Sequence, residues 1–157
     1  MRRVAPFLPF SLVIFLLTAL VCPAFSEDIQ TLIKDAEGGN PKAQFNLGIA
    51  YGNGQGVPQD YAESMKWFRM AAEQRHAGAQ CILGISYSIG QGVPQDYLLA
   101  YFWTSLASKS TACGSDTRGA NYFYMDYAAN AGRQLTPEQL KKAQQMILDW
   151  EAKHPRK

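Results

Sequence analysis

The chain has 157 residues, of which 47% are hydrophobic and 18% charged, and its formal net charge is +2. Two of its arginines, Arg2 and Arg3, precede an N-terminal apolar run, so the rest of the chain carries as many acidic as basic residues. A neutral chain lacks the positive charge that drives binding to phosphates, which excludes nucleic acid as the expected partner.

The first 26 residues have the pattern of a secretory signal peptide. The two arginines are followed by an apolar run from Phe7 to Val21, and small residues precede an expected cleavage after Ser26. Two alternatives remain open. One is a membrane anchor, although the run is shorter than the roughly 20 residues that span a bilayer; the other is a lipoprotein attached through Cys22. Cleavage predicts a secreted or periplasmic mature chain, residues 27–157, the size of one domain.

The mature chain would keep two cysteines, Cys81 and Cys113, in an oxidising compartment. Cys81 is expected early in one helix and Cys113 just beyond the end of its antiparallel partner, so one prediction is a disulfide between them. The other interpretation is two free thiols, with Cys81 serving as a small apolar residue.

One stretch of sequence occurs twice, as YGNGQGVPQDY at 51–61 and as YSIGQGVPQDY at 87–97. The constant step of 36 residues predicts a structural unit copied along the chain, because each such unit buries its apolar face against a neighbour. Before the first copy, Ala43, Leu47 and Tyr51 recur four residues apart, which is helical spacing. After the first copy, helical steps of three and four residues separate Ser64, Trp67 and Ala71. Each unit is therefore predicted to be a pair of helices.

The repeated stretch is predicted to be the turn between the two helices of a pair. Gly54 and Gly56 allow positive φ angles, and the proline that follows cannot prolong the first helix. Asp60 is expected to cap the second helix, with Glu63 completing a capping box, whereas Asp96 caps the second copy alone. A phosphate-binding loop is the alternative for these glycines, but the preceding strand and the Lys and Ser or Thr of such a loop are missing.

These residues resemble the Sel1-like repeat family, whose members are related to the tetratricopeptide helical hairpins. The resemblance rests on A-Q-F-N-L-G-I-A-Y-G-N-G-Q-G-V-P-Q-D-Y at 43–61, then Ser64, Trp67 and Ala71-Ala72, and on the corresponding run from Ala79 to Ala107. Arg75 departs from it, because the family usually has glycine there, and Ser64 replaces the usual alanine. The resemblance implies an all-α fold, a short α/α solenoid of helical hairpins with flanking capping helices.

The expected repeat domain, 27–157, then divides into a half repeat (27–39), two repeats (40–75 and 76–111) and divergent C-terminal capping helices (112–157). In the last part, Thr136 precedes a first-turn proline, and Gln139 is placed for the reciprocal bond of a capping box. Charged residues along this last helix suit a terminal cap that faces water.

The resemblance also implies a protein or peptide partner, because the first helix of each pair lines a concave surface in this architecture. The residues expected on that surface are Lys42, Phe45, Ile49, Asn53, Cys81, Ile85 and Ile89. The competing interpretation is that Phe45, Ile49 and Ile85 only fill contacts between neighbouring pairs.

Catalytic chemistry has little support in the sequence. The two histidines, His76 and His154, belong to no metal-ligand spacing, and no nucleophile motif accompanies the cysteines. We therefore expect no catalytic residue, metal or cofactor, and the leading hypothesis is an exported adaptor. The alternatives are a cell-envelope enzyme or glycan-binding factor acting on peptidoglycan-like material, to which some family members have been linked, and a spacer in a larger assembly.

Overall fold

The computed structural model describes residues 23–109, 127 and 129–155. Within these residues the chain forms helices and no strand. The main helices are α2 (Pro23–Glu37), α3 (Pro41–Asn53), α4 (Tyr61–Glu73), α5 (Ala77–Ile89), α6 (Tyr97–Ser108) and α8 (Pro137–Lys153), and residues 129–134 are helical as well. The predicted all-α solenoid is therefore confirmed. Cys113 and almost all of the expected signal peptide lie outside the described residues.

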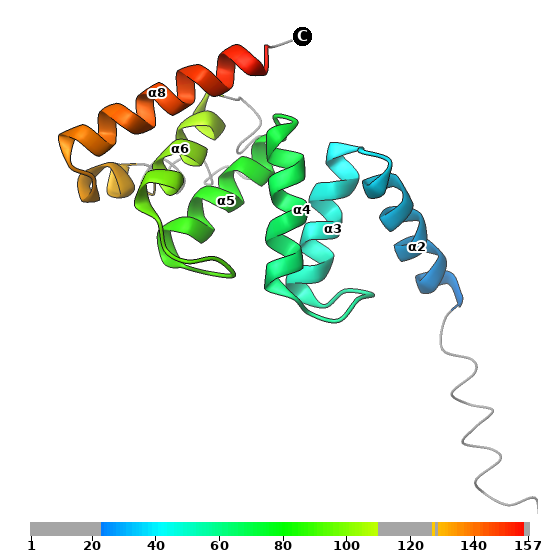
Figure 1. The fold of residues 1–157 in the computed structure, drawn as a ribbon. Coiled ribbons are helices and arrows are strands. Elements are labelled where there is room, and N and C mark those ends of the chain that lie inside the picture. Colours follow the sequence, from blue (N-terminus) through cyan, green and yellow to red (C-terminus); the bar gives the residue numbers. More distant parts are fainter. Residues whose placement is uncertain (1–22, 110–126, 128, 156–157) are drawn as a thin grey trace, which may run out of the picture.

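The helices pack in chain order as an array (Figure 1). α3 pairs with α4 and α5 with α6, and α4 packs on α5 to join the two hairpins. α2 lies against α3 at one end of the array, while α8 lies against α6 at the other (Figure 1). The second hairpin thus repeats the first and lies beside it.

A repeated Leu-Gly pair lets the two helices of each hairpin approach closely. Leu47 and Leu83 are fully buried at equivalent positions. A Cβ atom added at Gly84 would lie 2.3 Å from Cγ2 of Thr104, and one added at Gly48 would lie 2.8 Å from the ring of Phe68. The leucine fills the core and the glycine leaves room for the opposite helix, as close packing requires.

One buried glutamine in the first helix of each hairpin joins that hairpin to the helix before it. Gln44 Nε2 donates to the carbonyl of Ala36 at 3.1 Å, near the end of α2. Gln80 Nε2 donates to the carbonyl of Ala72 at 3.0 Å, near the end of α4. Each of these carbonyls also accepts from a backbone N–H group three residues on, Gly39 and Arg75 respectively, so the glutamine adds a second bond at a buried helix end.

The repeated turn has the conformation that its glycines predict. Gly54 and Gly56 have φ angles of 69° and 76°, and Gly90 and Gly92 have φ angles of 75° and 72°. These left-handed angles favour glycine, because a Cβ atom makes them costly. The same backbone geometry therefore explains why both copies keep the same glycines.

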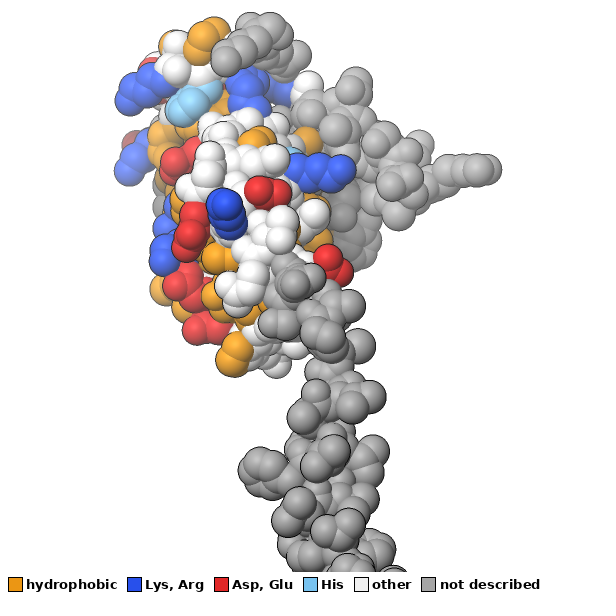
Figure 2. Space-filling view, turned by 90° about the vertical axis from the view of Figure 1, so that its right-hand side faces the viewer, with side chains coloured by type: hydrophobic (Ala, Val, Ile, Leu, Met, Phe, Trp, Pro, Cys, Tyr) orange, Lys and Arg blue, Asp and Glu red, His pale blue; other side chains and the backbone are white. Residues whose placement is uncertain are grey.

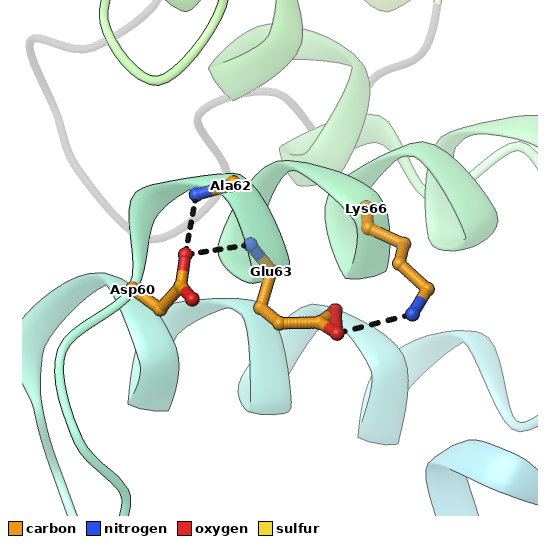
Figure 3. A network of polar contacts seen from close by, with 4 residues as sticks. All are labelled: Asp60, Ala62, Glu63 and Lys66. Carbon is orange, nitrogen blue, oxygen red and sulfur yellow. Dashed lines mark hydrogen bonds and ion pairs between the residues drawn. The ribbon is translucent and has the colours of Figure 1, made fainter.

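The predicted cap at Asp60 forms, but the predicted capping box with Glu63 does not (Figure 3). Asp60 Oδ1 accepts from the backbone N–H groups of Ala62 at 2.8 Å and Glu63 at 3.1 Å. The N–H of Asp60 already donates to the carbonyl of Tyr51 at 2.9 Å, so it is not available to the Glu63 carboxylate. That carboxylate instead accepts from Lys66 Nζ at 3.1 Å.

The caps predicted for α6 and α8 both form. Asp96 Oδ1 accepts from the N–H groups of Leu98 and Leu99 at 2.9 and 3.0 Å. At α8 the capping box does form: Thr136 Oγ1 accepts from the N–H of Gln139 at 3.2 Å, and Gln139 Oε1 accepts from the N–H of Thr136 at 2.9 Å. The start of α8 is therefore fixed by its own local sequence.

Arg75 takes the conformation of the glycine that it replaces. Its φ angle is 66°, in the left-handed region, and the equivalent Gly39 has a φ angle of 88°. Arg75 Nε donates to the carbonyl of His154 at 2.7 Å, and the guanidinium carbon lies 4.9 Å from the centroid of the Trp150 ring. The arginine therefore links the connection between the hairpins to the end of α8, which glycine could not do.

Candidate functional site

Two cavities open on either side of Ile49 in α3. The first, about 330 Å³, lies between α2 and α3, and its lining is mostly apolar. The second, about 280 Å³, lies between α3, α4 and α5 and is lined by both apolar and polar groups. Residues of the first are Asp28, Ile29, Leu32, Asn46, Ile49, Ala50 and Gln55. Residues of the second include Ile49, Asn53, Tyr61, Met65, Phe68, Ile82, Ser86 and Gln91.

Of the α3 residues that were predicted to bind a partner, some lie on the surface and others pack against neighbouring helices. Lys42 and Asn53 are exposed, and Asn53 lines the second cavity. Phe45 is half-buried and stacks on the ring of His76, with centroids 4.4 Å apart, so it fills a contact between the two hairpins. This is the role that the competing interpretation gives it. Ile49 packs on the core with part of its surface and lines both cavities with the rest.

The predicted residues of α5 differ strongly in exposure. Ile89 is 53% exposed and Ile85 is half-buried. Cys81 is only 2% exposed and packs with Ala77 and Ala107, so it has no surface to offer to a partner. We use the name inner surface for the predicted residues that remain accessible, Lys42, Ile49, Asn53, Ile85 and Ile89.

Cys81 also takes part in a disulfide, and its partner cysteine lies outside the described residues. The other two cysteines of the chain are Cys22 and Cys113. The pairing of Cys81 with Cys113 therefore stays a prediction. A bonded Cys81 is unavailable as a nucleophile, because the thiolate is the reactive form of cysteine.

Of the residues that line the second cavity, the sequence analysis predicted only Ile49 and Asn53 for the binding surface; the polar residues Tyr61, Ser86 and Gln91 are among those that it missed. Gln91 belongs to the repeated turn, which was interpreted for its backbone geometry alone. A signal was available, since Gln55 and Gln91 follow the first turn glycine of each copy and each lines a cavity. The second cavity is lined by amide, hydroxyl, backbone and apolar groups, which suits an uncharged ligand group.

His76 connects the two hairpins and caps α5. Its Nδ1 accepts from the N–H of Ala79 at 3.3 Å, and its ring stacks on Phe45. Burial lowers the pKa of His76 below the ordinary value of 6.5, because desolvation disfavours the charged form. The neutral ring is also the only form whose Nδ1 can accept a hydrogen bond at the cap.

Acidification is therefore expected to destabilise the fold through His76. The unfolded chain takes up a proton at a higher pH than the folded chain does, so the free energy of unfolding falls as the pH drops below 6.5. The loss ends once the pH is below the lowered pKa of the folded state. Urea unfolding measured between about pH 7 and about pH 5 should show this slope.

A matched variant isolates this effect. Asn40 occupies the equivalent position in the first hairpin and caps α3 by accepting from the N–H groups of Lys42 and Ala43. His76→Asn therefore keeps a good cap and removes the titrating group. Its stability should depend less steeply on pH than that of the wild type. Parallel profiles would show that His76 does not contribute to the acid sensitivity.

The described residues also bear on metal binding and membrane insertion. Within this part of the chain, no group of three or more His, Cys, Asp and Glu residues is placed to hold a metal ion. No helix of the same residues combines the length and apolar character needed to cross a bilayer.

Comparison with known proteins agrees with the repeat geometry. A model of the Sel1 repeat family matches residues 41–76 and 77–110. The chain is similar to a solved protective antigen, present in uropathogenic Escherichia coli strains and displaying an SLR fold, with 33% identity and a TM-score of 0.68. That match covers 82% of this chain and 26% of the antigen. It is also similar to a Sel1 repeat protein from Oxalobacter formigenes, with 34% identity and a TM-score of 0.56.

The second match covers 64% of this chain and 28% of the Oxalobacter protein, so the chain spans only about a quarter of each of these structures. Comparison with curated proteins gives no match. The two ranges matched by the family model correspond to the two hairpins, α3 with α4 and α5 with α6. The chain therefore contains two tandem Sel1 repeats, at residues 41–76 and 77–110.

Proposed function

We propose that the mature chain is an exported adaptor that binds an extended segment of a partner protein along the inner surface. Sel1 repeats typically mediate protein–protein interactions, which supports a partner of this class. The observation that carries the proposal is the exposure of apolar side chains along the first helices. Ile89 is 53% exposed on α5, and Ile49 on α3 lies between two cavities.

The chemistry of the inner surface fits a peptide with apolar side chains. Ile49 and Ile89 provide apolar contacts, and Asn53 and Gln91 place side-chain amides in or beside the second cavity. Side-chain amides carry both donors and acceptors, so they can bind the main chain of an extended segment.

Export is part of the same proposal. It is supported by the leader pattern of residues 1–26 and by the disulfide of Cys81, because disulfides persist in oxidising compartments. N-terminal sequencing of the protein from its source organism should find Glu27 as the first residue. A protein that retains the apolar run from Phe7 to Val21 would overturn this part of the proposal.

Photocrosslinking tests the binding surface. Probes at Ile49 and at Ile89 should capture the same partner from an extract of the source organism, because both positions line one inner surface. Met70 provides the control position. It is a large hydrophobic residue, 38% exposed, but it lies on α4, the second helix of the first hairpin, and so outside the inner surface. A probe at Met70 should not capture this partner.

The captured partner then allows a quantitative test. Ile89→Asp should weaken its binding by about tenfold or more, because the substitution places a charge against an apolar contact. Met70→Asp should leave the affinity unchanged, and both positions are exposed enough for the variants to fold. Equal affinities for the Ile89→Asp variant and the wild type would contradict the proposal. A zymogram with peptidoglycan would detect the alternative, a cell-envelope enzyme.

A further inference from the structure

The second cavity has a buried base and an exposed rim. Its buried lining residues are Gly48, Ser64, Met65, Phe68 and Ser86. Its exposed lining residues are Asn53, Gln59, Tyr61 and Gln91, and the rest are half-buried. A group that enters the cavity therefore passes polar side chains first and then reaches two large apolar side chains and two hydroxyls.

The lining of the second cavity is uncharged. The described residues that form it include no Asp, Glu, Lys, Arg or His. This is not a general feature of the surface, since Figure 2 shows acidic and basic side chains mixed with hydrophobic ones on the end of the molecule that carries α2. A charged group in the cavity would lose its hydration without gaining a partner of opposite charge, which is costly. The lining therefore selects an uncharged group.

Ser86 adds a buried hydroxyl that has no hydrogen-bond partner among the described residues. Ser86 is only 5% exposed, and it lines the second cavity. The other polar side chains buried to this extent each donate to a backbone carbonyl: Gln44, Ser64, Gln80, Ser88 and Thr104. Because a buried hydroxyl without a partner is costly, this position favours a ligand that supplies one.

The first hairpin lacks this hydroxyl. Ser86 is equivalent to Ala50, which is also 5% exposed and lines the first cavity. Since the same hairpin geometry forms around alanine in the first copy, the packing of the repeat does not require serine here. The Ser86 hydroxyl is thus a feature of the second cavity alone.

The rim of the second cavity is positioned by the turn after α5. A Cβ atom added at Gly92 would lie 3.1 Å from Cβ of Tyr61 and from Cγ of Met65, so this turn rests on the start of α4. Gln91, the preceding residue, is thereby placed at the edge of the cavity. Gln59 Nε2 donates to the Tyr61 hydroxyl at 3.1 Å, which leaves the hydrogen of that hydroxyl for a ligand.

The volume and the base of the cavity suit one aromatic ring. An apolar cavity of about 150 Å³ holds a benzene molecule, and the second cavity measures about 280 Å³. Met65 and Phe68, each 5% exposed, provide apolar and aromatic contacts for such a ring. The remaining volume leaves room for a polar substituent beside Ser86.

We infer that the second cavity binds a tyrosine side chain of the partner segment, an inference that rests on the adaptor function proposed above. The ring packs against Met65 and Phe68, its hydroxyl forms a hydrogen bond with Ser86 Oγ, and the polar rim binds the main chain on either side. Phenylalanine would leave the Ser86 hydroxyl unpaired. A sugar would place hydroxyls from several sides of its ring against the apolar side chains of the base, which disfavours it.

Capped pentapeptides of alanine with a different central residue test the inference without the partner. Acetylated and amidated ends remove the terminal charges. NMR titration of the mature chain, up to about 10 mM peptide, follows the amide shifts of Met65, Phe68 and Ser86. The peptide with a central tyrosine should bind about five- to tenfold more tightly than the one with phenylalanine, the net effect of one hydrogen bond. A central glutamate should abolish binding.

Two serine variants of α5 separate the hydroxyl from the rest of the pocket. Ser86→Ala should lose the preference for tyrosine and keep the affinity for the phenylalanine peptide. It should fold, because alanine stands at the equivalent position of the first copy, and circular dichroism checks this. Ser88→Ala is the matched control, since Ser88 does not line the cavity and its hydroxyl donates to the carbonyl of Ile85 at 2.7 Å. Its preference for tyrosine should be that of the wild type.

Three outcomes would overturn the inference: equal affinities of the wild type for the tyrosine and phenylalanine peptides, no saturable shift at the base of the cavity, or an unchanged tyrosine preference in Ser86→Ala. Shifts caused by N-acetylglucosamine but not by the tyrosine peptide would assign the cavity to a glycan instead. The adaptor function is tested separately. A probe at Ile89 can capture a protein whose bound segment lacks tyrosine, and the tyrosine peptide can bind even if no protein is captured.

Discussion

Gly84→Ala is expected to lower the free energy of unfolding by about 2–3 kcal/mol. In an open helix the same change would stabilise the protein by up to about 1 kcal/mol, because alanine is the better helix former. Here the added Cβ would lie 2.3 Å from Cγ2 of Thr104 and 3.0 Å from its backbone nitrogen. The side chain alone cannot relieve this clash, so α5 and α6 must move apart. Urea unfolding should show a lower midpoint with an unchanged slope.

Two further variants show whether the clash is the cause. Thr104→Ala removes the nearest atom but not the backbone contact, so it should restore only part of the stability lost in Gly84→Ala. Gly52→Ala is the matched control, because its Cβ would meet only the side chain of Ser64, and the second copy already has Ser88 at this position. It should change stability by less than about 0.5 kcal/mol. An unaffected Gly84→Ala variant would mean that α5 and α6 are not in close contact.

Trp103→Ala is expected to cost about 3–5 kcal/mol, the range for truncating a buried aromatic residue. Trp103 is 6% exposed and packs edge-on against Phe102, with centroids 4.9 Å apart, and against Trp150 of α8, with centroids 6.4 Å apart. Loss of the Trp103 ring therefore leaves a cavity between α6 and its neighbours, and it removes the contact with Trp150 that helps to hold α8 in place. Thermal unfolding should show a lower midpoint, and limited proteolysis should cut α8 sooner than in the wild type.

The repeat itself supplies the control for this prediction. Trp67 is the equivalent residue of the first hairpin, and it is only half-buried. Trp67→Ala should therefore lose less stability than Trp103→Ala. Equal losses in the two variants would show that the packing of α8 does not depend on Trp103.

The positions of the helices and turns could be predicted because neighbouring residues determine them. Gly54 and Asp60 act on the backbone within a few residues, and the capping box at Thr136 is equally local. The capping box predicted with Glu63 does not form, because a residue further away in the sequence intervenes. The carbonyl of Tyr51, nine residues earlier, takes the N–H group that the carboxylate would have bound.

The candidate surface was harder to predict, because exposure depends on which elements cover each helix. Cys81 and Ile89 belong to one series of residues that recurs every four positions on α5. Ile89 is nevertheless exposed, whereas Cys81 is buried against Ala107 of α6. Periodicity identifies a face of a helix, but only the packed neighbours decide how much of it remains open. The first cavity beside Ile49 depends on two helices and the second on three, so no single stretch of sequence indicates them.

Everything proposed for this chain requires two successive hairpins that lie side by side, with the start of α5 against α3. Proton–proton contacts from a NOESY spectrum of the mature chain report on this arrangement. The predicted result is a set of cross-peaks between the rings of Phe45 and His76, whose centroids lie 4.4 Å apart, and between Phe45 and Gly78. A folded, assigned protein in which these cross-peaks are absent would contradict the stacked array, and with it the inner surface and the tyrosine pocket.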